Sequence, residues 1–145
     1  MRKISPKGLD LIKKFEGFSA TTYLCPAGYP TIGYGHLIKE GECFPDPINE
    51  SQGLELLASD VSQAERAVDR FIDVPLNQSQ LDALISFTFN LGGGALQKST
   101  LRRKINLQEH EQVPPEFLRW VWAGKRKLPG LIKRRQAEAD MYKGI

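Results

Sequence analysis

Cysteine, histidine and long apolar runs are all scarce in this chain of 145 residues, which has two cysteines and two histidines. Two cysteines cannot define a disulfide framework, so we expect both thiols to be free. Two histidines without paired cysteine spacing argue against a structural zinc site. No apolar run approaches the ~20 residues of a membrane span, and the N-terminus lacks the apolar segment of a signal peptide. We expect synthesis in the cytoplasm and no membrane insertion of this chain, an expectation that leaves open an anchor preceding Met1.

Positive charge is concentrated in the C-terminal third of the chain. Residues 1–97 contain 8 Lys and Arg against 12 Asp and Glu, whereas residues 98–145 contain 12 against 5. Such a basic segment is typical of proteins that meet a polyanion, such as nucleic acid, a membrane surface or a bacterial wall. Solvated helix faces explain the same charges equally well, so charge alone leaves these alternatives open.

Helical periodicity covers most of the chain and predicts a mainly helical α+β protein. The first helix is predicted over residues 5–16, where Ser5 suits the N-cap and Pro6 suits the first turn. The other predicted helices span residues 51–72, 78–91, 100–106, 115–122 and 131–142.

Between residues 21 and 38 the pattern changes to short aromatic and β-branched stretches separated by a turn signal. We predict a β-hairpin formed by TTYLC and YPTIGYGHL around the turn PAG, with a third short strand near residues 41–44. On the second strand, Thr31 and His36 fall on opposite faces because side chains alternate along a strand.

These elements predict a single domain, residues 1–145, with two lobes. The N-terminal lobe, about residues 15–50, contains the hairpin, and the helical lobe spans residues 73–145. The helix at 51–72 joins them. A cleft between two lobes is a usual place for a ligand.

Glu16 has the most unusual expected environment among the acids. It falls at the C-terminal end of the first helix, where the helix dipole disfavours negative charge, and Phe15 and Phe18 flank it. Both effects favour the protonated carboxyl that a general acid requires. A surface glutamate on a frayed helix end is the alternative.

Cys25 lies at the turn of the predicted hairpin, with Thr31 on the following strand. A cysteine nucleophile needs a nearby base, and His36 is the obvious candidate. His36 falls on the wrong strand face, however, and no third orienting residue is evident. The pattern therefore disfavours a Cys–His hydrolase and favours a structural His36 paired with a carboxylate.

The spacing Glu16–x8–Cys25–x5–Thr31 resembles the catalytic signature of phage-type lysozymes, the endolysins of glycoside hydrolase family 24. In that family the signature reads Glu, eight residues, Asp or Cys, five residues, Thr. Three further stretches resemble the family's second strand, central helices and C-terminal segment, in the right order: PTIGYGHL, LISFTFNLGGGALQKSTLRRKIN and RWVWAGKRKLPGLIKRRQAEA. The resemblance covers essentially the whole chain.

The resemblance implies a catalytic role for each residue of the signature. Glu16 would be the general acid that protonates the glycosidic oxygen. Thr31 and Cys25 would hold and activate a water on the far face of the sugar, as in an inverting enzyme. Cysteine stands where the best-known members have aspartate, and a thiol ionises less readily than a carboxylate. Cys25 could act as a water acceptor or as a stabilising thiolate, which the family pattern favours, or be the relic of a dead enzyme.

The resemblance also implies substrate contacts at Leu37, Phe89 and Thr100, although Phe89 equally suits a hydrophobic core. It further implies a structural salt bridge between His36 and Asp60. We expect this pair to stabilise the fold at mildly acid pH, where the imidazole is charged.

The function that the resemblance implies is that of a muramidase. It would hydrolyse the β-1,4 bond between N-acetylmuramic acid and N-acetylglucosamine in bacterial peptidoglycan during phage lysis, as a monomer, without metal or cofactor. The anionic wall would then be the partner of the basic segment, and nucleic acid would not. Made in the cytoplasm, the enzyme would reach the wall after a separate membrane pore forms.

Three alternatives accompany this interpretation: an inactive wall-binding module, a nucleic-acid-binding helical protein and a lytic transglycosylase. The first rests on Cys25 alone, and the second offers no explanation for the Glu/Cys/Thr hairpin. The third uses one glutamate and needs no positioned water. A disulfide between Cys25 and Cys43 would block the site under oxidising conditions.

Overall fold

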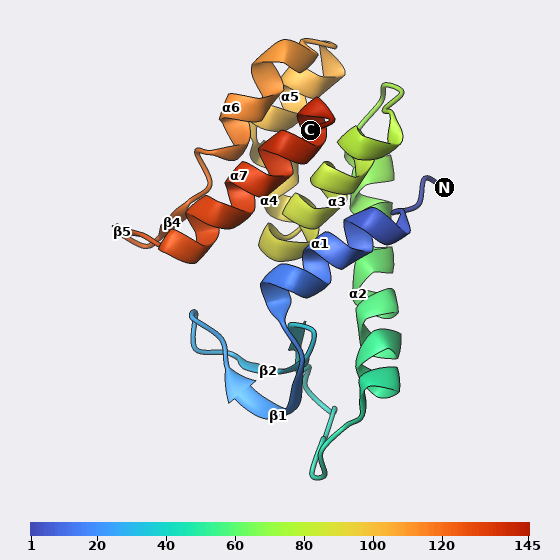
Figure 1. Ribbon diagram of the computed structural model, residues 1–145, viewed down its shortest axis with the longest axis vertical. Helices are drawn as coiled ribbons and strands as arrows, with labels where there is room; N and C mark the ends of the chain where they lie inside the picture. The colour runs from blue at the N-terminus through green and yellow to red at the C-terminus, as the bar shows by residue number, and fades with distance from the viewer.

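A computed structural model describes residues 1–145 as a small sheet lobe and a larger helical lobe joined by one long helix (Figure 1). The helices are α1 (Pro6–Glu16), α2 (Glu50–Phe71), α3 (Gln78–Leu91), α4 (Gly93–Lys98), α5 (Thr100–Asn106), α6 (Val113–Phe117) and α7 (Pro129–Lys143), with a 3-10 turn at His110–Gln112. The strands are β1 (Ser19–Leu24), β2 (Pro30–Gly33) and β3 (His36–Leu37) in one sheet, and β4 (Trp122–Ala123) and β5 (Arg126–Lys127) in another. The predicted α+β class is confirmed. No helix has both the length and the apolar character needed to cross a bilayer.

Side-chain caps fix where the first three helices begin. Ser5, Asn49 and Asn77 each accept a backbone N–H from the first turn of α1, α2 and α3, respectively. The two asparagines form complete capping boxes with Gln52 and Gln80. These local signals explain why the predicted starts of all three helices lie within one residue of the observed ones.

Helix α3 is the centre of the helical lobe and packs against α1, α2, α4 and α7. Every residue from Leu81 to Thr88 is buried, whereas periodicity predicts one buried face. Buried polar side chains require hydrogen-bond partners. Those of α3 have them: Asp82 accepts from Ser5, Ser86 donates to Glu138, and Thr88 donates to the Leu84 carbonyl. Contacts to α1 and α7 thus explain why α3 is buried all round.

The sheet differs from the prediction in its second half, because YPTIGYGHL is two strands. A turn at Tyr34 and Gly35 separates β2 from β3, which pair antiparallel as Thr31 with Leu37 and Ile32 with His36. Gly35 has a φ of +74°, which L-residues with a side chain rarely adopt. The strand predicted near 41–44 is therefore wrong, since β3 is the third strand. Thr31 and His36 still lie on opposite faces, because they belong to adjacent cross-strand pairs.

The helix predicted at 115–122 is wrong at its C-terminal end. Helix α6 ends at Phe117, and Trp122 instead begins β4 of a second hairpin. Gly124 is the first residue of the two-residue turn in this hairpin and has a φ of +64°. The favoured two-residue hairpin turns require a positive φ at that position. Strands of two residues are too short to show a period, so the sequence pattern could not reveal them.

A buried histidine joins the sheet lobe to α2, the helix that runs along one side of the molecule (Figure 1). His36 Nδ1 lies 2.8 Å from Asp60 Oδ2 on α2, and His36 Nε2 lies 3.0 Å from Glu42 Oε1. Sequence reasoning missed Glu42. A hydrogen bond from the Lys39 backbone N–H and the nearby His36 lower the pKa of the Glu42 carboxyl, although burial opposes them. The imidazole therefore lies between two carboxylates, one on α2 and one on the loop between β3 and α2.

Replacing Glu42 with glutamine should reduce stability in a pH-dependent way. Because its pKa is lower in the native state, Glu42 contributes stability that is complete above its unfolded pKa and disappears as pH falls through its native pKa. We expect Glu42→Gln to cost about 0.5–1 kcal/mol in the free energy of unfolding at pH 6–7. This difference should shrink below about pH 4.3.

The measurement is urea unfolding of both proteins across this pH range. Glu40→Gln is the matched control, since Glu40 is exposed and has no ion pair. A cost that stays constant down to pH 2 would show that the charge of Glu42 is not responsible.

Candidate active site

Glu16 lies where three parts of the chain meet. It is the last residue of α1, and Gly17, with a φ of +67°, turns the chain into β1. Its side chain is 17% exposed, and its Oε2 lies 2.5 Å from Nη1 of Arg134 on α7. On another side it adjoins Gly35, where an added Cβ would lie 2.8 Å from the Glu16 Cδ. The carboxylate is thus held between the last helix and the β2–β3 turn.

A buried cluster of charges holds Arg134 in place. Arg134 Nε donates to Glu138 Oε2 at 3.3 Å, and Arg134 Nη2 donates to the Ser86 carbonyl at 3.4 Å. Arg135 is also fully buried and donates to Asn90 Oδ1 at 2.7 Å. Two arginines are therefore balanced by two carboxylates, of which Glu16 is one.

Arg135 and Glu138 are the fully buried members of this cluster, and they can form a charged pair. Burial lowers the pKa of Arg135 to about 10, which leaves the guanidinium charged at neutral pH. Burial also raises the pKa of Glu138, while Arg135, Arg134 and the Ser86 hydroxyl oppose this rise. Arg135 Nε lies 2.8 Å from Glu138 Oε1, yet neither atom has a well-aligned hydrogen bond. Charge attraction is therefore the main component of this contact.

Arg134 changes the expected electrostatics of Glu16. The sequence placed Glu16 beside a helix dipole and aromatic rings only, whereas the structure adds a guanidinium in direct contact with it. Sequence reasoning missed this partner because it lies 118 residues away, on a helix with no local connection to Glu16. The nearest sequence signal is the pair of adjacent arginines in α7, which charge alone does not distinguish from surface cations.

Cys25 follows β1 at the start of the turn to β2, and Thr31 lies on β2 just after that turn. The Thr31 side chain is buried, and its hydroxyl donates to the Tyr29 carbonyl at 2.9 Å. Burial by itself raises the pKa of the Cys25 thiol and is the largest single effect. The backbone amides of Tyr29, Ala27 and Gly28 and the neighbouring Thr31 side chain together outweigh it, so the thiol pKa is lowered. The turn thus favours the thiolate.

Tyr23 links this turn electrostatically to Glu16. Burial raises the pKa of Tyr23, and the charges of Glu16 and Cys25 raise it further. Because both charges act on the Tyr23 phenol, this side chain lies near both groups. Tyr23 is two residues before Cys25 on an extended segment, and sequence reasoning did not single it out.

Both cysteines are free, as predicted, with Cys25 half-buried and Cys43 exposed. No group of three or more His, Cys, Asp and Glu side chains is arranged to hold a metal ion.

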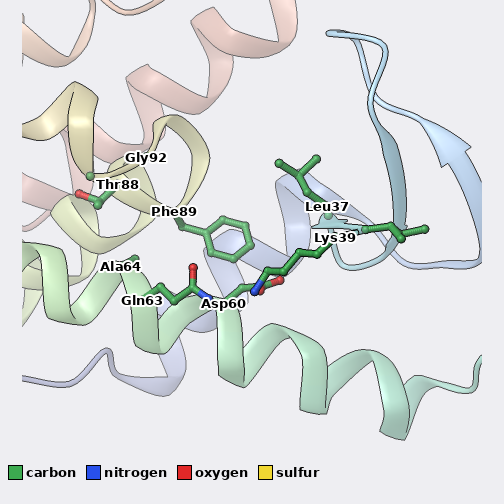
Figure 2. A pocket seen from close by; sticks show the side chains of 11 residues that line it. Leu37, Lys39, Asp60, Gln63, Ala64, Thr88, Phe89 and Gly92 are labelled. Carbon is green, nitrogen blue, oxygen red and sulfur yellow. The ribbon is translucent and has the colours of Figure 1, made fainter. Parts of the chain in front are cut away.

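A cavity of about 360 Å³ begins at Gly35 and lies between the sheet lobe, α2 and the end of α3. Leu37 and Phe89 both line it, and Figure 2 shows the Phe89 ring directed toward the side of Leu37. Lys39 and Asp60 form another part of its wall, with the Lys39 side chain extending toward Asp60 (Figure 2). Thr100 does not line this cavity; its hydroxyl accepts from Arg103 at the start of α5. Two of the three predicted substrate contacts are therefore brought together.

An acid held beside a cleft between two lobes is an arrangement suited to hydrolysis of a polymer, and the comparisons with known proteins agree. Residues 13–138 match the model of the family described as phage lysozyme. The chain belongs to the phage lysozyme family, and it is a glycoside hydrolase of the lysozyme class that acts on bacterial peptidoglycan.

Individual relatives cover nearly the whole chain. It is 43% identical to an endolysin of Acyrthosiphon pisum secondary endosymbiont phage 1, over 96% of this chain and 97% of that protein. It is 37% identical to an endolysin of Salmonella phage P22, with the same coverage. The solved endolysin of Escherichia coli O157:H7 phage FAHEc1 superimposes with a TM-score of 0.89 at 36% identity, over 97% of this chain and 93% of that one.

Replacing Gly35 with alanine should reduce activity far more than stability. The added methyl group would collide with the Glu16 carboxylate and displace it, and the positive φ adds a cost of about 1–2 kcal/mol. We expect Gly35→Ala to lower the rate of peptidoglycan hydrolysis at least about tenfold in protein that is still folded.

Gly41→Ala is the matched control, because Gly41 has a φ of +88° but no atoms within 4 Å of an added Cβ. It should show a similar loss in the free energy of unfolding with full activity. Equal activities of the two variants would contradict the close approach of Gly35 to Glu16.

Proposed function

We propose that this enzyme cleaves the β-1,4 bond between N-acetylmuramic acid and N-acetylglucosamine by a single displacement, with Glu16 as the general acid. The observation that carries this proposal is the placement of Glu16. Its carboxylate is fixed on Arg134 and adjoins Gly35, which forms one edge of the cavity lined by Leu37 and Phe89. A sugar chain in this cavity would extend past the carboxyl group. Inversion of the anomeric centre follows from direct attack by water.

Arg134 supports this role by holding the carboxyl group in position. When Glu16 gives its proton to the leaving oxygen, it becomes an anion at 2.5 Å from a buried guanidinium. The ion pair stabilises that anion and so favours the transfer of the proton in the transition state. We therefore propose Arg134 as a positioning residue that fixes the place of the Glu16 carboxyl group.

The water that attacks the sugar must give up a proton, and in this proposal the Cys25 thiolate takes it, while the Thr31 oxygen accepts a hydrogen bond that orients the water. The Thr31 hydroxyl donates to the Tyr29 carbonyl, which leaves its oxygen lone pairs for a water. The amides of the turn stabilise a thiolate at Cys25, and a thiolate accepts a hydrogen bond. The pair can thus orient a water without a second carboxylate.

The biological setting that fits is lysis of the host cell by a phage. The chain would be made in the host cytoplasm and would act as a monomer on the wall once a membrane pore has formed. Its basic C-terminal third suits an anionic wall, and nucleic acid is not part of the proposal.

Glu16→Gln tests the acid. Without a proton donor, clearing of a suspension of purified wall should slow by about 10²–10⁴-fold. Glu55→Gln, a change at an exposed glutamate of α2, should clear at the rate of the unmodified enzyme. Equal rates for all three proteins would remove Glu16 from the chemistry.

The products of the unmodified enzyme decide the reaction type in the same experiment. A reducing sugar that is released as the α anomer supports inverting hydrolysis, whereas a β anomer would indicate retention. An anhydro-sugar end would identify a lytic transglycosylase instead.

Cys25→Asp should retain or raise activity and extend it to lower pH. A carboxylate with an ordinary pKa of about 3.9 stays ionised in acid solution, whereas a thiol loses its charge well above that pH even when its pKa is lowered. Cys25→Ala should lose activity by about tenfold or more, because no acceptor replaces the sulfur. The measurement is the initial rate of wall hydrolysis between pH 4 and 9.

Cys43→Ala is the control for thiol removal, since Cys43 is exposed and free. Unchanged rates in both alanine variants would mean that Thr31 alone is sufficient to place the water.

A further inference from the structure

Tyr23 lies in one row with Thr31 and Leu37 across the three strands of the sheet. Tyr23 on β1 pairs with Thr31 on β2, and Thr31 pairs with Leu37 on β3. Residues directly opposite one another on neighbouring strands have their side chains on the same face of the sheet. Adjacent strands are about 4.8 Å apart, so the backbones of Tyr23 and Leu37 are separated by roughly 10 Å. Because Leu37 lines the cavity, the row extends from the cavity past Thr31 to Tyr23.

Cys25 lies on the same face of the hairpin as this row. The strand pairing continues one position beyond β1, where the Cys25 N–H donates to the Tyr29 carbonyl at 2.9 Å. Side chains alternate along an extended strand, so Tyr23 and Cys25 share one face and Leu24 lies on the other. Tyr23 is therefore a neighbour of both residues that the proposed function assigns to the attacking water.

The side chains of the row differ in how far they are exposed. Thr31 is 1% exposed, whereas Tyr23 is 36% exposed and Leu37 is 53% exposed. Threonine is also a shorter side chain than the two that flank it. A sugar placed over Thr31 therefore meets the Tyr23 ring on one side and Leu37 on the other.

The Tyr23 phenol is a hydrogen-bond donor that has no partner within the chain. The hydroxyls of Tyr34 and Tyr142 each have such a partner, whereas that of Tyr23 has none. Burial raises the pKa of Tyr23, and the charges of Glu16 and Cys25 raise it further, so the phenol keeps its proton at neutral pH. A neutral phenol can donate a hydrogen bond to a ligand that reaches it.

We propose that Tyr23 contacts the sugar at the point of cleavage: its ring packs against the sugar over Thr31, and its hydroxyl donates a hydrogen bond to an oxygen of that sugar. A sugar presents both C–H groups and oxygen acceptors, which suits a side chain with an apolar ring and a polar end. The contact holds the sugar in the orientation that attack by water requires. This inference rests on the proposed function, because it requires the glycan to pass over Thr31.

The test separates the ring of Tyr23 from its hydroxyl. Tyr23→Phe removes the hydroxyl alone, and Tyr23→Ala removes the ring as well. Leu24→Ala is the matched control, because Leu24 is 68% exposed and lies on the other face of the same strand. The measurements are kcat and KM for hydrolysis of sonicated peptidoglycan between pH 4 and 9. Unchanged thermal unfolding temperatures establish that the variants are folded.

We expect Tyr23→Phe to lower kcat/KM about tenfold, as the loss of one hydrogen bond to the substrate would. The pH at which each limb of the activity profile falls should stay the same, since the phenol is neutral throughout this range. Tyr23→Ala should lower kcat/KM about a further tenfold, because the packing of the ring is lost too. Leu24→Ala should remain within about twofold of the unmodified enzyme.

Binding measured without cleavage gives a second readout. In proteins that also carry Glu16→Gln, Tyr23→Ala should weaken the affinity for sonicated peptidoglycan by about tenfold or more, whereas Leu24→Ala should leave it within about twofold. A residue that only stabilised the hairpin would lower the unfolding temperature and leave the affinity of the folded protein unchanged.

Three outcomes would overturn the proposal. Full activity in both Tyr23 variants would show that the side chain does not touch the sugar. A loss of rate with a displaced limb of the pH profile would show that Tyr23 acts through Glu16 or Cys25 instead. An equal loss in Leu24→Ala would trace the effect to the strand rather than to the phenol.

Failure of the proposed function gives a different pattern. Absence of cleavage by the unmodified chain, or an unchanged rate in Glu16→Gln alone, contradicts the function itself. Where the unmodified chain cleaves and Glu16→Gln does not, the Tyr23 variants test only the contact with the sugar.

Discussion

The ion pair between Glu16 and Arg134 is the interaction on which the rest of the site depends. It joins residues that are 118 positions apart and so requires α1, α3 and α7 to be packed together before it can form. Arg134 cannot be buried next to Arg135 unless carboxylates balance both charges, and Glu138 and Glu16 provide them. Removing one member of a buried ion pair leaves an uncompensated charge at a cost of several kcal/mol. The proposed acid is thus also part of the folded core.

This dual role explains why so many buried polar groups converge on one face of α3. Ser86 donates to Glu138 and offers its carbonyl to Arg134, while Asn90 accepts from Arg135. None of these groups touches the cleft, yet together they restrict where the Arg134 guanidinium can lie. A guanidinium whose N–H donors are already held by acceptors in its plane loses little further entropy when it holds a carboxylate. The geometry at Glu16 is therefore set mainly from the side of the molecule that faces away from the cavity.

The sequence predicted what local chemistry decides and missed what depends on distant contacts. The start of α1 follows from a cap at Ser5, which the sequence predicted, and the structure shows further caps at Asn49 and Asn77 for α2 and α3. The Glu16, Cys25 and Thr31 spacing led to the family because the three residues lie on one short stretch. Arg134 and Glu42 gave no such signal, since their roles come from the packing of α7 and from a loop folding back on His36. The two-residue strands β3 to β5 were too short for any period to show.

The two sides of the proposed site use different means to handle charge, and the difference bears on the cysteine. On the Glu16 side, buried side chains of opposite charge balance one another. On the Cys25 side, burial raises the pKa of the thiol, and the backbone amides of Tyr29, Ala27 and Gly28 are among the groups that outweigh burial and lower it. Amide dipoles in a tight turn form a preorganised concavity for an anion, whichever side chain supplies it. Because the turn rather than the side chain provides this stabilisation, it is available to a thiol as well as to a carboxylate. The backbone of the β1–β2 turn is therefore the feature that makes cysteine acceptable at this place.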